Sequence, residues 1–167
     1  MNIINIVINK IRYINKIKKL KMKRVFVEYP SSLLRIDNIL FGENIYIGPK
    51  CYIFAKGGLN IGSNVRIGPC VKIWTENHNY RSQELLPYDY DDISMPVSIG
   101  DNVWIGLGAM ICPGTTIGEG AIIGMGAVVR GNIPPCSIVV GNPGTIVGER
   151  DGNIYTRLVD EKKFHKL

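Results

Sequence analysis

Histidine is scarce in this sequence, and its scarcity excludes one kind of metal site. The 167 residues contain two histidines, and because His165 lies two residues from the end, His78 stands alone in the body of the chain. A zinc ion held by three histidines cannot be built from such a chain. The cysteines are too widely spaced for a Cys-x-x-Cys pair, so we expect no metal and four free thiols, buried or half-buried: Cys51, Cys70, Cys112 and Cys136.

The chain also lacks a hydrophobic run long enough to span a bilayer. Its opening apolar stretch, residues 3–8, is interrupted by Asn5, and no small-residue cleavage site follows. Neither a signal peptide nor a transmembrane helix is indicated. We therefore expect a cytoplasmic protein, either soluble or peripheral to the inner face of the membrane.

Acidic residues are missing from residues 1–24, which hold eight Lys or Arg side chains. The net charge of +6 therefore belongs to this arm, because the rest of the chain has twelve bases against fourteen acids. Ile4, Ile8 and Ile11 recur at helical spacing before bases replace them, which predicts a short basic amphipathic helix.

Such an arm is open to three interpretations. It can lie on an anionic membrane surface, as basic amphipathic segments do. It can equally pack on the rest of the chain or on a neighbouring subunit. Binding to nucleic acid is the least favoured interpretation, because aromatic side chains are absent from the arm apart from Tyr13. We expect no nucleic-acid partner.

What the sequence has in abundance is an aliphatic residue followed by glycine, repeated every six positions. A helix repeats its apolar face at roughly 3.6 residues and a strand at 2, so a strict six predicts short strands joined by turns. The phase extends over four sets of three positions: Phe41, Ile47 and Ile53; Ile61, Ile67 and Ile73; Ile99, Ile105 and Ile111; Ile117, Ile123 and Val129.

Both interruptions of the repeat follow the third member of a set, a short one at residues 55–60 and a long one at residues 74–98. If three hexapeptides form one triangular coil, both insertions leave from the same corner of a prism. The aliphatic residues then point inward, small residues fill the corners, and the following glycines permit tight turning. Stacked coils are expected about 4.8 Å apart.

Over residues 37–148 this pattern resembles the hexapeptide-repeat acyltransferases. The resemblance implies an all-β fold, a left-handed parallel β-helix, although crossover connections are in general right-handed. We expect the helical arm at 1–24, the β-helix domain at 25–148 with a protruding loop at 75–96, and a tail at 149–167. Family members are typically homotrimers with sites between subunits, and a symmetric trimer would bury the exposed sides of the prism.

The long loop contains the candidate for chemistry, His78. Sugar and antibiotic acetyltransferases of this superfamily carry a histidine at the start of the corresponding loop, and the string "ENHNY" resembles those of polysaccharide O-acetyltransferases. The resemblance implies that His78 is a general base, a role worth about 10²–10⁴-fold in rate, and that Asn77 and Tyr80 bind the acceptor. The group that orients the imidazole stays open between a backbone carbonyl and the nearby acids, none of which is assigned: Glu76, Glu84, Asp89, Asp91 and Asp92.

Trp104, in the string "NVWIG", occupies an outward position where a polar residue would be usual. Galactoside and maltose acetyltransferases have a tryptophan at this point of the same string, where it lines the site. The resemblance therefore implies that Trp104 binds the acceptor. The alternative is a tryptophan buried between neighbouring prisms.

The resemblance also implies a route for acetyl-CoA along the late coils. The matching positions are Leu107, Met125, Arg130, Gly131, Asn142 and Pro143, the last two in the string "GNPGTIV". Relatives often carry basic residues where this chain has Gly131, Thr145 and Gly148, which weakens the expected clamp on the CoA phosphates. Arg130 and Arg150 are the candidates to replace it.

The resemblance implies an acetyl-CoA-dependent O-acetyltransferase that acts on a hydroxyl of a sugar in capsule, exopolysaccharide or O-antigen synthesis. Within enzymes, the alternative is an antibiotic acetyltransferase of the streptogramin type, whose loop is usually longer. The alternative of a different class is a β-helix that serves as a structural or interaction module without catalysis. The string "NHNY" discriminates between these classes, because such modules tend to lack a histidine at the start of the loop.

Overall fold

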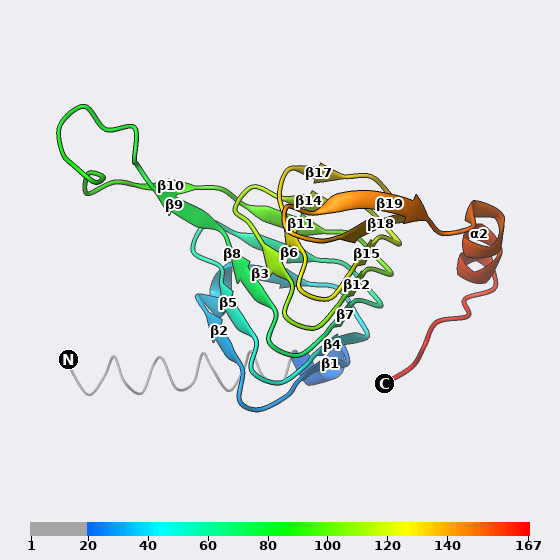
Figure 1. Ribbon diagram of the computed structural model, residues 1–167. Coiled ribbons are helices and arrows are strands. Elements are labelled where there is room, and N and C mark those ends of the chain that lie inside the picture. The colour runs from blue at the N-terminus through cyan, green and yellow to red at the C-terminus, as the bar shows by residue number, and fades with distance from the viewer. Residues whose placement is uncertain (1–19) are drawn as a thin grey trace, which may run out of the picture.

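Residues 20–167 are described by the computed structural model, and they form a three-sided prism of stacked coils (Figure 1). Three parallel sheets make the sides, which we call faces A, B and C. Each coil contributes one strand to each face in turn, and the coils wind in the left-handed sense that the resemblance implies.

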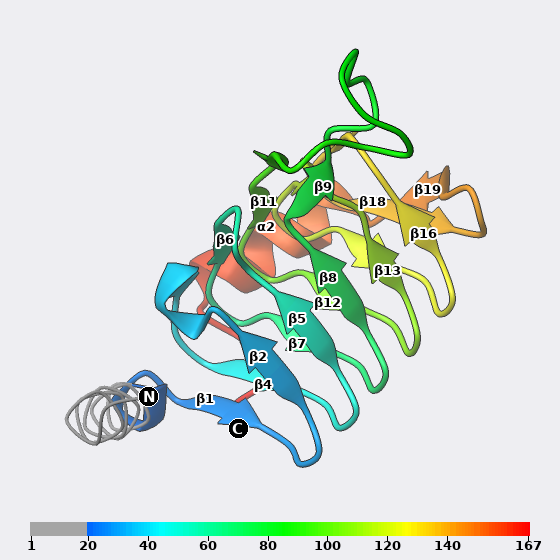
Figure 2. The same ribbon diagram turned by 90° about the vertical axis from the view of Figure 1, so that its left-hand side faces the viewer.

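The strands are short, and each pairs with the strands one coil away. Face A contains β1 (Val25–Val27), β4 (Ile45–Ile47), β7 (Arg66–Ile67), β12 (Trp104–Ile105), β15 (Ile122–Ile123) and β18 (Ser137–Val140). Face B, which fills the view in Figure 2, contains β2 (Ser32–Leu34), β5 (Tyr52–Phe54), β8 (Lys72–Trp74), β13 (Met110–Ile111) and β16 (Val128–Val129). Face C contains β3 (Ile39–Phe41), β6 (Leu59–Ile61), β11 (Val97–Ile99), β14 (Thr116–Ile117) and β17 (Asn132–Ile133).

The core is the column of aliphatic side chains that the six-residue period predicts. All twelve phased positions are buried, and Ile47, Ile67 and Ile105 are 0% exposed. The strand register places each of these residues beside the corresponding residue of the next coil. Ile67, for example, pairs with Ile105, and Ile105 pairs with Ile123. Because each buried aliphatic side chain contributes about 1.5–3 kcal/mol, the column supplies a large share of the stabilising free energy.

Glycine at the corners acts differently from the prediction. A Cβ on Gly106, which follows Ile105, would lie 2.7 Å from the backbone nitrogen of Met125 in the next coil. This glycine is therefore required by the close approach of stacked coils. The turn itself is made two residues later, where Gly108 has a φ of +68°.

Both insertions leave from the corner between faces B and C, as predicted. The short one joins β5 to β6, and the long one joins β8 to β11. Within the long insertion, β9 (Glu76–His78) and β10 (Asp92–Ser94) form an antiparallel hairpin that projects from the prism. The hairpin therefore stands outside the three ladders.

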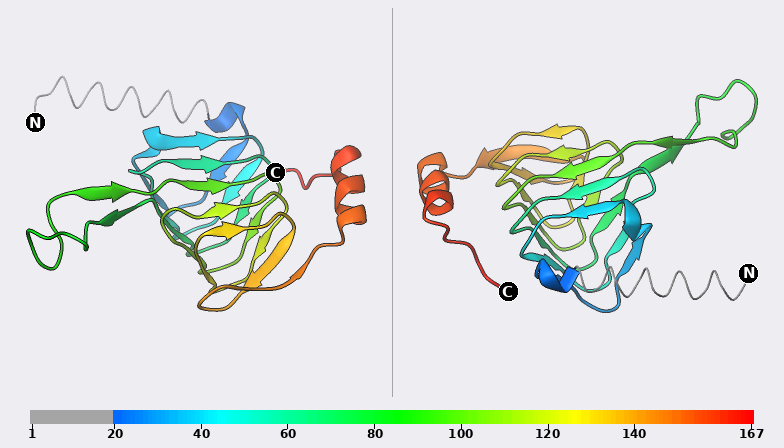
Figure 3. Two further views of the ribbon diagram at one scale, coloured as in Figure 1. Left: turned by 90° about the horizontal axis from the view of Figure 1, so that it is seen from above. Right: turned by 180° about the vertical axis from the view of Figure 1, so that it is seen from behind.

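The chain closes the last coil in a way that the sequence analysis did not predict. Strand β19 (Thr145–Glu149) turns back antiparallel to β18, and helix α2 (Gly152–Asp160) follows. Asp151 caps this helix by accepting a hydrogen bond from the backbone nitrogen of Ile154. Figure 3 shows α2 and the β9–β10 hairpin at opposite sides of the prism.

Residues 1–19 lie outside the part of the chain that the structure describes, so most of the predicted N-terminal helix is not tested. Residues 20–22 are helical and lead into β1, and a short 3-10 helix, η1 (Ile36–Asn38), lies between β2 and β3. No helix among residues 20–167 combines the length and apolar character that crossing a membrane requires. All four cysteines are free, with Cys51 buried and the others half-buried, as predicted.

Candidate active site

The hairpin places His78 opposite an acidic side chain. His78 ends β9 and Asp92 begins β10, and the two residues are direct partners in the antiparallel register. Their side chains meet, with 2.8 Å between His78 Nδ1 and Asp92 Oδ1. Of the five acids that the sequence left open, Asp92 is therefore the one bonded to the imidazole.

This contact fixes which ring nitrogen carries the proton. An ionised carboxylate can only accept, so Nδ1 is the donor, and the neutral imidazole of His78 keeps its lone pair on Nε2. On one side the ring stacks against Tyr88, with 4.0 Å between ring centroids and 7° between ring planes. The side chain nevertheless remains 54% exposed, so the imidazole is held in place and accessible.

Lys56, from the short insertion at the same corner, holds the carboxylate in turn. Its Nζ contacts Asp92 Oδ2 and lies 3.0 Å from Oε2 of the buried Glu76. The hydrogen bond from Lys56 is the main reason why the pKa of Asp92 falls below its ordinary value of 3.8, and the same bond raises the pKa of Lys56. Asp92 is therefore ionised at neutral pH, as its bond to His78 requires.

Sequence reasoning missed Lys56, although a signal for it was present. The spacing between Lys56 and Asp92 is 36 residues, and no local motif joins them. The signal was the shared corner, because two insertions that leave from one corner must lie side by side.

Replacing Lys56 with methionine tests this arrangement. We expect kcat to fall by about tenfold or more, because Asp92 loses the partner that positions it. We also expect a lower melting temperature, because the buried Glu76 carboxylate loses its cation. Adding Glu76→Gln should restore the melting temperature but not kcat. If the second substitution restored both, Lys56 would be a purely structural residue.

Asn77 and Tyr80 stay with His78 on the hairpin, as their sequence positions dictate. Asn77 is exposed, and its Oδ1 accepts a hydrogen bond from the backbone nitrogen of His78, 3.0 Å away. Tyr80 is 60% exposed, and the guanidinium of Arg81 lies 5.6 Å from the centre of its ring. Both side chains are free to meet a ligand beside the imidazole.

Trp104 is not brought to His78 within one chain. It lies on β12 of face A and is 54% exposed, whereas the hairpin leaves from the corner between faces B and C. In a three-sided prism this corner is opposite face A. A site that uses both residues therefore needs two chains.

The candidate donor residues lie at two corners that flank face B. Leu107 and Met125 are 53% and 77% exposed and follow β12 and β15. The Asn142–Pro143 step follows β18 at the same corner, while Arg130 and Gly131 follow β16 at the corner of the hairpin. The exposed apolar row at the first corner suits the aliphatic arm of a thioester donor.

Comparison with known proteins decides the family. Residues 96–131 match the family described as bacterial transferase hexapeptide (six repeats). A maltose O-acetyltransferase from Clostridium difficile 630 is 36% identical, with a TM-score of 0.69 over 77% of this chain and 68% of that one. The chain belongs to the hexapeptide-repeat acetyltransferases.

Two further proteins are similar to this hexapeptide-repeat acetyltransferase. A galactoside acetyltransferase in complex with coenzyme A is 33% identical, with a TM-score of 0.72 over 79% of this chain and 65% of that one. Nodulation protein L from Rhizobium meliloti (strain 1021) is 42% identical over 66% of this chain and 60% of its own length. The chain spans between 50% and 66% of the length of such curated relatives.

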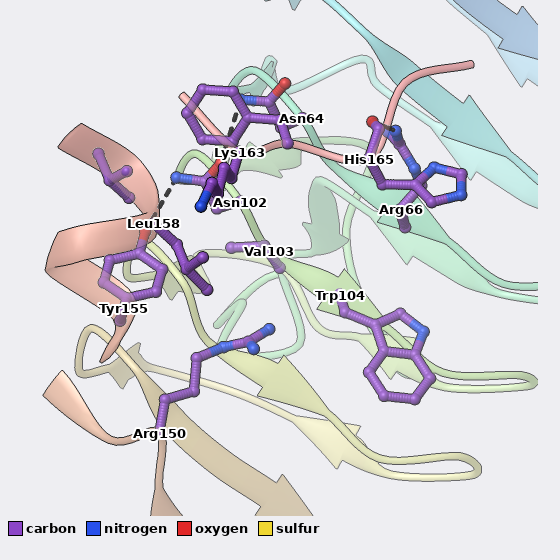
Figure 4. A pocket seen from close by; sticks show the side chains of 12 residues that line it. Asn64, Arg66, Asn102, Val103, Trp104, Arg150, Tyr155, Leu158, Lys163 and His165 are labelled. Atoms are coloured by element: carbon purple, nitrogen blue, oxygen red, sulfur yellow. Dashed lines mark hydrogen bonds between the residues drawn. The ribbon is translucent and has the colours of Figure 1, made fainter. Parts of the chain in front are cut away.

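A second concave site in this hexapeptide-repeat acetyltransferase lies between face A and the C-terminal tail (Figure 4). Its cavity of about 280 Å³ is lined by cationic, amide and aromatic side chains from β7, β12, α2 and the segments beside them, among them Asn64, Arg66, Asn102, Trp104, Arg150 and Tyr155. Sequence reasoning missed this site, because nothing in residues 149–167 indicated that the tail returns to face A. Among residues 20–167, no group of three or more His, Cys, Asp or Glu side chains could hold a metal ion.

Proposed function

We propose that the chain is an acetyl-CoA-dependent O-acetyltransferase that modifies a hydroxyl of a sugar, in the synthesis of a capsule, exopolysaccharide or O-antigen polysaccharide. The observation that carries the proposal is the hydrogen bond of His78 Nδ1 to Asp92, which leaves Nε2 of the exposed imidazole without a partner among residues 20–167. The relatives named as galactoside and maltose acetyltransferases support the sugar acceptor.

In the proposed reaction, His78 Nε2 accepts the proton of the sugar hydroxyl as its oxygen attacks the thioester carbonyl. The carbon–sulfur bond breaks, the sulfur of CoA leaves with the electron pair, and the imidazolium returns the proton to that sulfur. Asp92 stabilises the imidazolium while it exists. The acetyl group passes directly to the sugar, with no covalent intermediate on the protein.

The proposed donor and acceptor sites are those that the family resemblance implies, and the exposure of their side chains supports them. Leu107, Met125, Asn142 and Pro143 would contact the pantetheine arm of acetyl-CoA, with Arg130 and Gly131 at the next corner. Asn77 and Tyr80 would contact the acceptor together with Trp104 of a neighbouring chain. The opposite placement of Trp104 and His78 supports a homotrimer with its sites between subunits.

Mass spectrometry tests the function. The full chain is incubated with acetyl-CoA and a panel of free sugars, nucleotide sugars, oligosaccharides and one streptogramin antibiotic. We expect a sugar to gain the mass of one acetyl group, and light scattering of the same sample to give three chains. A gain on the antibiotic alone would identify the other acetyltransferase class, and absence of CoA binding would identify a non-catalytic module.

The N-terminal arm is proposed to hold the enzyme at the cytoplasmic face of a membrane, where polysaccharide precursors are often carried on lipids. Met22 within the arm and Phe26 and Tyr29 just after it are 85%, 49% and 92% exposed. Together with the basic residues before them, they match the composition of interfacial anchors.

Vesicle co-sedimentation tests the arm. We expect the full chain to bind vesicles that contain phosphatidylglycerol and to release them as salt screens the charges. Replacing Lys10, Lys16 and Lys18 with glutamine should weaken binding, because each base contributes about 1 kcal/mol near an anionic surface. Equal binding to neutral phosphatidylcholine vesicles would contradict the electrostatic role.

A further inference from the structure

The cavity between face A and the C-terminal tail is strongly cationic. Arg66, Arg150 and Lys163 line it, and no Asp or Glu is among the lining residues described within 20–167. Lys163 is paired outside the lining, with 2.6 Å between its Nζ and Glu161 Oε2, so the unpaired cations are the two arginines. Figure 4 shows Arg66 and Arg150 on two sides of the cavity, with Val103 between them and Trp104 below. The cavity therefore presents positive charge to whatever enters it.

Arg66 is a half-buried cation without a carboxylate partner among residues 20–167. Its two terminal nitrogens donate to oxygens of neutral groups, namely the backbone and side chain of Asn44, Val65 and the carbonyl of His165. Its Nε is buried and has no hydrogen-bond partner in the described part of the chain. Burial lowers the pKa of the guanidinium, as expected for a charge without a counter-ion.

Arg150 lies across the cavity from Arg66 and also lacks a carboxylate partner among residues 20–167. Its Nε donates to the carbonyl of Gly120, 2.6 Å away, and it forms no ion pair with any residue between 20 and 167. Two guanidiniums that face one cavity without carboxylates fit an anion with several oxygens. The planar fork of donors on each guanidinium matches the oxygens of a phosphate.

The other walls fit a sugar. The side chain of Trp104 is exposed at one end of the cavity, and Asn64 and Asn102 place side-chain amides at the other end, near α2 (Figure 4). The amides form a ladder, with Asn64 Nδ2 donating to Asn102 Oδ1 and Asn102 Nδ2 donating to the Tyr155 hydroxyl. A few polar groups beside an apolar wall are typical of small-molecule sites.

We propose that this cavity binds the phosphate of a phosphorylated acceptor sugar, an inference that rests on the proposed function. A phosphate could also come from the CoA donor. Apart from Arg150, which lines this cavity, the expected donor residues lie at the two corners that flank face B, whereas Asn64 and Asn102 lie at the third corner, between faces C and A. The location therefore favours the acceptor as the source of the phosphate.

The C-terminal tail occupies part of this position in the structure. The carbonyl of His165 accepts hydrogen bonds from Arg66 and from Asn44 Nδ2. A phosphate oxygen carries more negative charge than a carbonyl oxygen and is the stronger acceptor for the same donors. A bound phosphosugar would replace this carbonyl and move residues 165–167 aside.

Isothermal titration calorimetry on the full chain tests the binding, with glucose 1-phosphate, glucose and inorganic phosphate as probes. We expect glucose 1-phosphate to bind at least about tenfold more tightly than glucose, and Arg66→Gln to remove about tenfold of its affinity. Lys163→Gln should weaken binding in the same direction. Because the Lys163 side chain is 61% exposed, this variant keeps the test valid if Arg66→Gln fails to fold.

Arg157→Gln is the matched control. Arg157 and Lys163 both pair with Glu161, so each variant removes one positive charge and one ion pair to the same carboxylate. Arg157 does not line the cavity, so the affinity of Arg157→Gln for glucose 1-phosphate should stay unchanged. Equal affinities for glucose and glucose 1-phosphate would overturn the proposal. So would an equal loss of affinity in Arg157→Gln and Lys163→Gln, because that result would indicate a general charge effect.

Kinetics then separate the two sources of phosphate. In acetyl transfer to a phosphorylated sugar, Lys163→Gln should raise KM for the sugar and leave KM for acetyl-CoA unchanged. A rise in KM for acetyl-CoA alone would assign the cavity to the donor and overturn the proposal. If the wild-type chain transferred acetyl to no sugar at all, the proposed function would fail, whereas the calorimetric result would still decide whether the cavity binds phosphate.

Discussion

Replacing His78 with alanine is expected to lower kcat by about 10²-fold or more, because the proton of the attacking hydroxyl loses its acceptor. The dissociation constant for CoA should be nearly unchanged, because the candidate donor residues lie on the prism and not on the hairpin. Steady-state kinetics on an acceptor found by mass spectrometry, together with direct titration of CoA, check both expectations.

Gln83→Ala serves as the control for this prediction. Gln83 lies in the same loop and is exposed. Its replacement therefore also shortens a side chain in this loop but leaves the imidazole of His78 intact. Both variants should melt at the temperature of the parent, since substitutions at exposed positions change stability little. A His78→Ala variant that keeps the parent kcat would assign the proton transfer to another group.

Replacing Gly57 with alanine is expected to cost about 3 kcal/mol or more of folding free energy. The new Cβ would lie 1.8 Å from the carbonyl oxygen of Thr75, so backbone must move against backbone. Thr75 cannot yield easily, because its hydroxyl accepts from the nitrogen of Gly57 and donates to the carbonyl of Phe54. Urea unfolding measures the loss.

The same substitution should also reduce acetyl transfer, because Gly57 follows Lys56 and Thr75 precedes the hairpin. Gly148→Ala is the control, since a Cβ at Gly148 would meet no atom within 4 Å. If Gly57→Ala proved as stable as Gly148→Ala, the two insertions would not be held together at this corner, and the support of Lys56 for Asp92 would be in doubt.

The prism was predictable because its signal is local and repeated. Each phased position, from Phe41 to Val129, predicts the same inward-facing place in a coil. The interruptions at residues 55–60 and 74–98 predict which corner carries the insertions. Each of these residues was found where the period placed it. The handedness was not in the period, because an inward aliphatic every six residues fits a coil of either hand.

The remaining features depended on contacts between distant segments. Asp92 could not be chosen among five acids before the register of the β9–β10 hairpin was known, and Lys56 reaches it only through the folding of both insertions. The return of the tail to face A depends on single hydrogen bonds, such as that of Arg66 to His165. The six-residue period does not indicate which side chains form contacts of this kind.

The hairpin that carries His78 starts and ends at one corner, and none of the three ladders passes through it. Its length can therefore change at little cost, since each doubling of a flexible loop adds only about 0.6 kcal/mol of closure entropy. Evolution can exchange or extend this segment while the aliphatic column stays constant. New acceptor preferences can thus arise by selection on one appendage, separately from selection on the scaffold that keeps the protein folded.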